Sequence, residues 1–175
     1  MDRIGRPLLL AALALTLVAA AFAAWGGWSW YGAAHDDTAS YATARDNALE
    51  AGEQAVQNLN TLDHKKLADG LDLWETSTTG ALHTQLVDGR SAFEKQVREA
   101  KTVSTAKVLD GALTELDARA GKARVLVALR VTVTASGGKS SEKDSRMLGE
   151  LTRTDGHWKL SALGQAPVGD TATTD

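Results

Sequence analysis

Few side chains in this 175-residue chain could do acid–base chemistry together. A buried Asp, Tyr or His acts as a general acid or base when its surroundings shift its pKa. The first candidates are Tyr41, Asp72 and His83, with Trp74 close by in the sequence. Tyr41 and Trp74 fall on apolar stripes of helical period, and His83 is one residue away from such a stripe, which is typical of packed positions. We therefore predict no catalytic residue and keep Tyr41, Trp74 and His83 as candidates for lining a pocket.

The sequence also lacks the motifs of metal, phosphate and nucleophile sites. It contains no cysteine, which excludes disulfides, thiol nucleophiles and thiolate metal ligands. Its four histidines are far apart, and it has neither a Gly-rich phosphate loop nor a Gly-x-Ser-x-Gly elbow. The net charge of -3 gives no attraction for nucleic acid. We predict a protein that is not an enzyme and has no metal, no cofactor and no nucleic-acid partner.

An uncharged segment runs from Pro7 to Ala34 and sets the chain's location. As a helix, residues 8–31 span about 36 Å at 1.5 Å per residue, which is enough to cross the roughly 30 Å hydrocarbon core of a bilayer. We therefore predict a transmembrane helix over residues 8–31. Trp and Tyr rings favour the membrane–water interface. The predicted interface residues are Trp25, Trp28, Trp30 and Tyr31.

Charges on either side of this segment predict its orientation. Arg3 and Arg6 precede it and two aspartates follow it closely. By the positive-inside rule, residues 1–7 are cytoplasmic and the rest of the chain is extracytoplasmic, as in a single-pass cell-membrane protein. The alternative is a secretory signal peptide cleaved after Ala23. The apolar run is longer than the 7 to 15 residues typical of a signal peptide core, so we favour a permanent anchor.

Beyond a short polar connector at residues 32–37, the hydrophobic pattern is first helical and then alternating. Apolar residues three and four apart predict helices at about 38–59, around Leu67 to Trp74, and from the loop at Gly80 to about residue 100. Gly89 lies within the third helix and costs about 1 kcal/mol relative to alanine.

From Lys101 onward the alternation predicts four antiparallel strands. The strongest covers Ala123 to Ala135, and a weaker one at 102–116 precedes it. Asp155-Gly156 between two alternating runs is a strong hairpin signal for the last two strands. One face of the strongest strand is apolar, and its members are Val125, Val127, Leu129, Val131 and Val133.

These elements predict one α+β domain over residues 38–164, in which three helices cover one face of a four-stranded antiparallel sheet. A sheet of this length should curve around the helices into a cone. Residues 165–175 have the composition of a disordered tail.

Five segments carry a resemblance to a known family: Ala44–Leu49, Asn58–Asp63, Phe93–Val108, Ala123–Ala128 and Arg153–Leu160. In this order, behind one apolar segment, they resemble the Mce-associated membrane proteins, single-span partners of bacterial Mce lipid-transport systems. No single motif among them is diagnostic. The resemblance implies a cystatin-like cone, similar to nuclear transport factor 2 and to the periplasmic domain of a type IV secretion assembly factor. It also implies a non-catalytic role in assembling or stabilising an Mce-type lipid-transport complex at the cell envelope.

The sequence leaves a second function open. The cone could bind a lipid or another small apolar ligand, or carry out catalysis, while tethered to the membrane. A second copy of the chain also stays open as a partner. The candidate contact surfaces are the aromatic cluster at the membrane and the exposed strand face with Arg130, Thr132 and Thr134.

Overall fold

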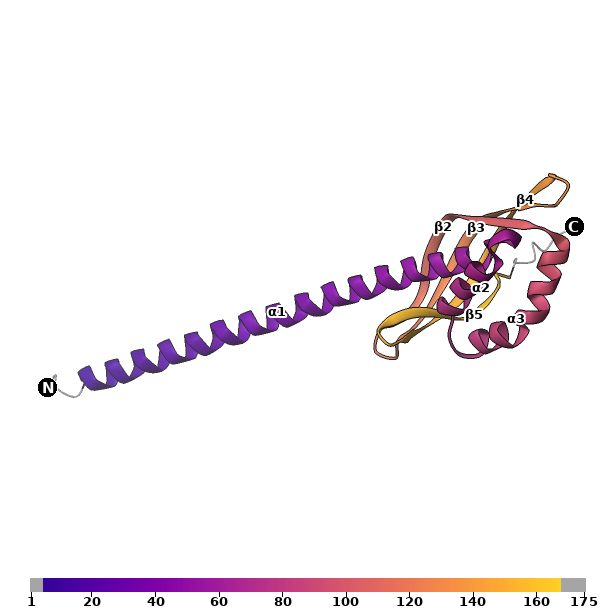
Figure 1. Ribbon diagram of the computed structural model, residues 1–175. Helices are drawn as coiled ribbons and strands as arrows, with labels where there is room; N and C mark the ends of the chain where they lie inside the picture. The colour runs from indigo at the N-terminus through magenta and orange to yellow at the C-terminus, as the bar shows by residue number, and fades with distance from the viewer. Residues whose placement is uncertain (1–4, 168–175) are drawn as a thin grey trace, which may run out of the picture. The chain divides into compact units, whose positions relative to one another are not determined.

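The computed structural model describes residues 5–167, with side chains described for all of these except 5–14 and 33–37 (Figure 1). The predicted cytoplasmic N-terminus, residues 1–7, and the predicted disordered tail, residues 165–175, lie partly outside this range. The chain divides into two compact units with the boundary between Thr43 and Ala44. Each unit is described by itself.

Helix α1 runs without a break from Gly5 to Leu59. The predicted membrane segment, the connector at 32–37 and the first domain helix are therefore parts of one helix. The physical reason lies in residues 33–51, which contain no Gly or Pro and are rich in alanine, the strongest helix former. Because no Gly or Pro interrupts this alanine-rich sequence, the helix continues through the polar residues of the connector. Among the side chains that the structure describes, no helix has a stretch long and apolar enough to cross a membrane.

Three shorter helical elements follow in the second unit: η1 (His64–Lys66), α2 (Leu67–Thr76) and α3 (Gly80–Ala100). The Asp63 carboxylate accepts a hydrogen bond from the Lys65 amide at 2.8 Å and so starts η1. Lys101, in the left-handed region with φ 50°, ends α3, and its amide donates to the Val97 carbonyl. The predicted second and third helices are both present.

The sheet is antiparallel throughout and has the order β1-β2-β3-β4-β5. The strands are β1 (Leu62–Asp63), β2 (Val103–Asp117), β3 (Lys122–Thr134), β4 (Ser140–Thr154) and β5 (His157–Gln165). The α+β class is confirmed, but the prediction of four strands was wrong by one. The additional strand, β1, is only two residues long and pairs with Ser104 and Val103. Two residues are too few to show an alternating pattern.

The hydrophobic core lies between the sheet and the domain part of α1. Val125, Val127 and Leu129 of β3 are fully buried, which confirms this part of the predicted apolar face. Val131 is half-buried and Val133 is exposed, because the distal end of the β3–β4 hairpin extends past this core. Figure 1 shows α2 and the last turns of α1 lying across the strands.

Helix α1 approaches the sheet closely through small residues. Ala48, Gly52 and Ala55 are spaced four and three apart, so they share one face of the helix. A Cβ atom added at Gly52 would lie 2.8 Å from Val125 Cγ2 and 3.2 Å from Leu151 Cδ1. Glycine at position 52 therefore sets the distance between α1 and β3.

The two edges of the sheet, formed by β5 and by the part of β2 that β1 does not cover, are protected in different ways. The segment Ser77–Thr79 covers the middle of β5, since Thr79 N–H donates to the Leu160 carbonyl at 2.9 Å and Leu160 N–H donates to the Ser77 carbonyl at 3.0 Å. Along β2, the register with β3 shifts between Val108 and Asp110 and again between Leu113 and Glu115. Such bulges distort the edge of a sheet.

Candidate functional site

A concave surface with aromatic side chains lies between α2 and α3. Trp74 and Phe93 face each other there with ring centroids 5.3 Å apart. The Trp74 indole N–H donates to the Asn58 carbonyl at 2.7 Å, which fixes the orientation of the ring. Trp74 packs with three buried leucines, Leu62, Leu67 and Leu71. We call this surface the α2–α3 groove and define it by Leu71, Trp74, Leu86, Gly89, Arg90 and Phe93.

Two cavities open beside the aromatic pair. One, of about 210 Å³, is lined by the residues of the α2–α3 groove. The other, of about 300 Å³, lies against Leu59, Val97 and Ser104 and shares Trp74 and Phe93 with the first. The two rings therefore form a wall of both cavities, and a ligand in either one would contact them.

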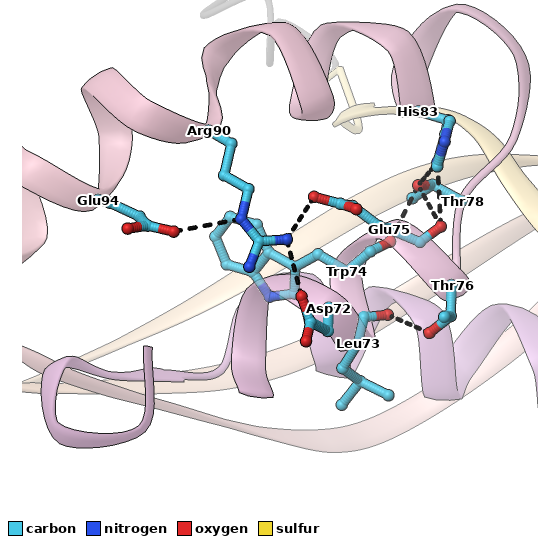
Figure 2. Close-up of polar contacts among 9 residues, drawn as sticks. All are labelled: Asp72, Leu73, Trp74, Glu75, Thr76, Thr78, His83, Arg90 and Glu94. Atoms are coloured by element: carbon cyan, nitrogen blue, oxygen red, sulfur yellow. Dashed lines mark hydrogen bonds and ion pairs between the residues drawn. The ribbon is translucent and has the colours of Figure 1, made fainter. Parts of the chain in front are cut away.

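Arg90 joins α2 to α3 at the rim of the groove. Its Nη1 atom lies 2.7 Å from Asp72 Oδ1 and 2.7 Å from Glu75 Oε1, and its Nε atom lies 3.2 Å from Glu94 Oε1. Figure 2 shows the guanidinium reaching from α3 toward the carboxylates of Asp72 and Glu75 on α2. The hydrogen bond to Glu75, followed by those to Asp72 and Glu94, raises the pKa of Arg90 above its ordinary value. The cation is therefore permanent at physiological pH.

The rim of the groove has an excess of negative charge. Helix α2 contributes Asp72 and Glu75 and α3 contributes Glu94, all paired with Arg90. A second arginine, Arg98, lies 3.6 Å from Glu94. The guanidinium groups of Arg90 and Arg98 thus pair with three carboxylates, those of Asp72, Glu75 and Glu94.

The three predicted pocket residues, Tyr41, Trp74 and His83, lie in different parts of the structure. Trp74 lines both cavities. His83 Nδ1 lies 3.0 Å from the Glu75 carbonyl and 3.4 Å from Thr78 Oγ1, so the ring fastens the start of α3 to the end of α2. Tyr41 is 52% exposed and belongs to the first unit. Within the described residues, no group of His, Asp and Glu side chains could hold a metal ion.

Of the six residues that define the groove, sequence reasoning named only Trp74 as a pocket candidate and missed Leu71, Leu86, Gly89, Arg90 and Phe93. It considered Gly89 only as a cost to helix formation. A signal was available, because Arg90 and Glu94 are four residues apart on a helix and the acids of α2 recur every three residues. That pattern predicts an ion-pair network but does not say which helices it joins.

The aromatic cluster at residues 25–31 lies in the first unit. Its members are strongly exposed: Trp25 75%, Trp28 83%, Trp30 81% and Tyr31 67%. Burying rings of this size is energetically favourable, and in this chain they are not buried. The cluster is therefore a second candidate surface.

The exposed strand face predicted as a contact surface consists of Arg130, Thr132 and Thr134, and these side chains contact residues of β4. Arg130 makes a two-pronged ion pair with Asp144, with N–O distances of 2.7 and 2.9 Å. Thr134 Oγ1 lies 2.9 Å from Ser140 Oγ. The hydrogen bonds from Arg130 lower the pKa of Asp144 below its ordinary value. These side chains hold the β3–β4 hairpin together.

A family model described as "Uncharacterized protein Rv1363c/MT1408-like" matches residues 7–167. The chain belongs to this family. No curated protein matches the chain by sequence.

Solved structures share the fold of this Rv1363c/MT1408-like protein. The periplasmic domain of DotI is 16% identical with a TM-score of 0.57, over 69% of this chain and 93% of that chain. An IcmL-like type IV secretion system protein from Legionella pneumophila is 13% identical with a TM-score of 0.56, over 71% and 93%. CagV, a VirB8 homologue of the type IV secretion system of Helicobacter pylori, is 13% identical with a TM-score of 0.50, over 68% and 95%. Identities this low show a common fold and nothing finer.

Proposed function

We propose that this protein is a non-catalytic, membrane-anchored accessory subunit whose extracytoplasmic domain holds other proteins of an envelope complex. The observation that carries the proposal is the exposure of large apolar side chains along the part of α1 that belongs to the first unit. They include Leu15, Leu17, Phe22, Trp28 and Trp30. Burying such side chains contributes about 1.5 to 3 kcal/mol each, and a bilayer is the environment that can bury them on all sides of a helix.

The sequence before these residues extends the apolar run. Residues 8–14 are all Leu or Ala, and no charge interrupts Pro7 to Ala34. Together with the described residues 15–31, this gives a segment long enough to span the hydrocarbon core. The aromatic cluster then lies at the interface on the extracytoplasmic side, and residues 1–7 lie in the cytoplasm.

The fold supports an accessory role in the envelope. The similar structures include a periplasmic domain and components of type IV secretion systems, which are multi-protein assemblies. The finer assignment, to an Mce-type lipid-transport complex, rests on the sequence resemblance in segments such as Asn58–Asp63 and Arg153–Leu160.

The absence of cysteine permits a clean test of topology. Asp2→Cys and Gly137→Cys each introduce a single thiol, and a Cβ at Gly137 meets nothing within 4 Å. A membrane-impermeant maleimide should label position 137 in intact spheroplasts and position 2 only after permeabilisation. The chain should stay in the membrane pellet after an alkaline carbonate wash. A carbonate-soluble chain, or labelling of position 2 in intact spheroplasts, would contradict the proposed topology.

The accessory role is tested by purification of the tagged full chain from gently solubilised membranes. Mce-type transport subunits should co-purify. A matched chain in which an unrelated single-span helix replaces residues 8–31 separates binding by the domain from binding by the native membrane helix. If both chains recover no transport subunit, the accessory role is wrong.

One observation favours the alternative of a lipid or small apolar ligand. The cavity of about 300 Å³ beside Trp74 and Phe93 reaches the lower end of the volumes usual for ligand pockets, roughly 300 to 1,000 Å³. Native mass spectrometry of the chain purified from membranes tests it. A retained lipid that Trp74→Ala releases would support the alternative, whereas a ligand-free chain would remove it.

A further inference from the structure

Gly89 is a residue that the packing of the fold does not require. It lies inside α3, where glycine disfavours a helix relative to alanine. A Cβ atom added there would meet nothing within 4 Å. Gly89 also lines the cavity of the α2–α3 groove. Glycine at position 89 therefore leaves the wall of this cavity open and does not stabilise the isolated domain.

The size of the cavity indicates what it can hold. Its volume of about 210 Å³ is below the roughly 300 to 1,000 Å³ of small-molecule pockets. It is suited to a single large aliphatic or aromatic side chain. The Trp74 ring is already fixed by its hydrogen bond to Asn58, so docking would order little that is mobile. Trp, Phe and Arg are also the residue types enriched where proteins meet.

The charge at the rim indicates the chemistry around such a side chain. At the rim, Asp72 and Glu75 of α2 and Glu94 of α3 outnumber the two cations that pair with them, Arg90 and Arg98. Arg90 is shared among three carboxylates and so neutralises them only in part. A segment with Lys or Arg beside its hydrophobic residue gains attraction here, and an acidic segment is repelled.

We propose that the α2–α3 groove docks one large hydrophobic side chain of a basic segment on a partner protein. The side chain inserts beside Trp74 and Phe93 past Gly89, and the flanking cations pair with the carboxylates of α2. The inference rests on the proposed accessory role and names the chemistry of the partner for that role.

The test uses the full chain in phosphatidylcholine nanodiscs, whose zwitterionic surface does not attract cationic peptides. The probe is a twelve-residue peptide with two leucines four positions apart among lysines. Its counterparts carry glutamate for every lysine, or alanine for both leucines. The lysine–leucine peptide should shift the Trp74 indole resonance, assigned with Trp74→Phe, and should bind at least about tenfold more tightly than either counterpart, a difference of roughly 1.4 kcal/mol.

Two variants on the same helix separate docking from folding. Gly89→Leu fills the cavity wall and should weaken peptide binding at least about tenfold, while its Tm stays equal or rises because leucine favours a helix. Ala92→Leu is the matched control, because Ala92 is exposed on α3 and does not line the cavity. It should bind the peptide as the unchanged chain does.

Several results would overturn the inference. They are equal binding of the glutamate counterpart, peptide binding that leaves the Trp74 resonance unchanged, and full binding by Gly89→Leu. Displacement of the peptide by laurate at the same resonance would assign the cavity to an apolar ligand, and self-association through this groove would assign it to a second copy of the chain. Co-purification of transport subunits by a chain that fails these peptide tests would remove this inference and leave the accessory role standing.

Discussion

Gly52 and Gly89 are both glycines inside helices, yet the structure gives them opposite roles. At Gly52 a Cβ would collide with Val125, a stiff β-branched side chain that is fully buried. At Gly89 there is open space. The helical pattern of the sequence contains no information that separates the two, because the difference arises from what lies opposite each residue in the fold.

A matched pair of substitutions measures this difference. Gly52→Ala should destabilise the domain by about 1 to 2 kcal/mol, because overpacking costs about 1 to 3 kcal/mol and the gain in helix propensity offsets up to about 1 kcal/mol. Gly89→Ala should stabilise it by up to about 1 kcal/mol. Urea unfolding of the full chain followed by circular dichroism measures both. A Gly52→Ala chain as stable as Gly89→Ala would show that α1 can move away from the sheet at little cost.

Asp144 provides a prediction about pH. Arg130 lowers the pKa of Asp144 in the folded chain, so the unfolded chain binds this proton more readily. The stabilisation is therefore present above the unfolded pKa of about 3.9 and is lost as the pH falls through the lower folded value. Asp144→Asn should lower Tm slightly at pH 7, and the difference should shrink as the pH falls through the lowered folded pKa of Asp144. Because the pair is exposed, 1 M salt should reduce the effect at pH 7. A Tm difference that stays constant as the solution is acidified would assign the effect to something other than the carboxylate charge.

At the scale of elements, the Arg90 network determines how α2 is held against α3. Arg90→Met keeps an aliphatic stem and removes the cation, leaving Asp72, Glu75 and Glu94 close together without compensation. Hydrogen exchange of the α2 amides should then become faster, while the amides of β3 and β4 stay protected. Arg98→Met is the control, since Arg98 contacts only Glu94 in the described network, at 3.6 Å. Equal exchange rates in α2 of both variants would contradict a special role for Arg90.

The sequence predicted elements where the signal is local. Alternation marked the buried face of β3 because a period of two can be read from consecutive residues, and Asp155-Gly156 marked the last hairpin for the same reason. The strand β1 was missed because its two residues form a strand only through pairing with β2. The connector at 32–37 was expected to interrupt α1 because polarity was given more weight than helix propensity.

The candidate site was harder to predict than the fold. The apolar stripe indicated that Trp74 is packed, and the structure packs it against buried leucines and also places it in the walls of two cavities. The Arg90 network joins residues of two helices, so it depends on how the helices pack and not on spacing along the chain. Tyr41 was grouped with Trp74 by residue type, although it falls in the other unit.

At the scale of the whole molecule, we expect residues 8–31 of α1 to insert into a bilayer. Leu17→Arg places a charge within the apolar segment, where an arginine costs about 2.5 to 3.5 kcal/mol on insertion scales. The variant should move in part from the membrane pellet to the carbonate-soluble fraction. Leu109→Arg is the matched control, because Leu109 is exposed on β2 in the second unit. Equal retention of both variants in the pellet would argue against residues 8–31 as the anchor.

If the chain is anchored as proposed, the protection of both edges of the sheet has a consequence for its behaviour at a membrane surface. Molecules confined to two dimensions meet one another far more often than the same number in free solution. An open strand edge under such crowding is a template for polymerisation into fibrils. The Ser77–Thr79 segment blocks one edge and the two bulges of β2 distort the other. The domain can thus be present at high surface density and still remain available to other proteins.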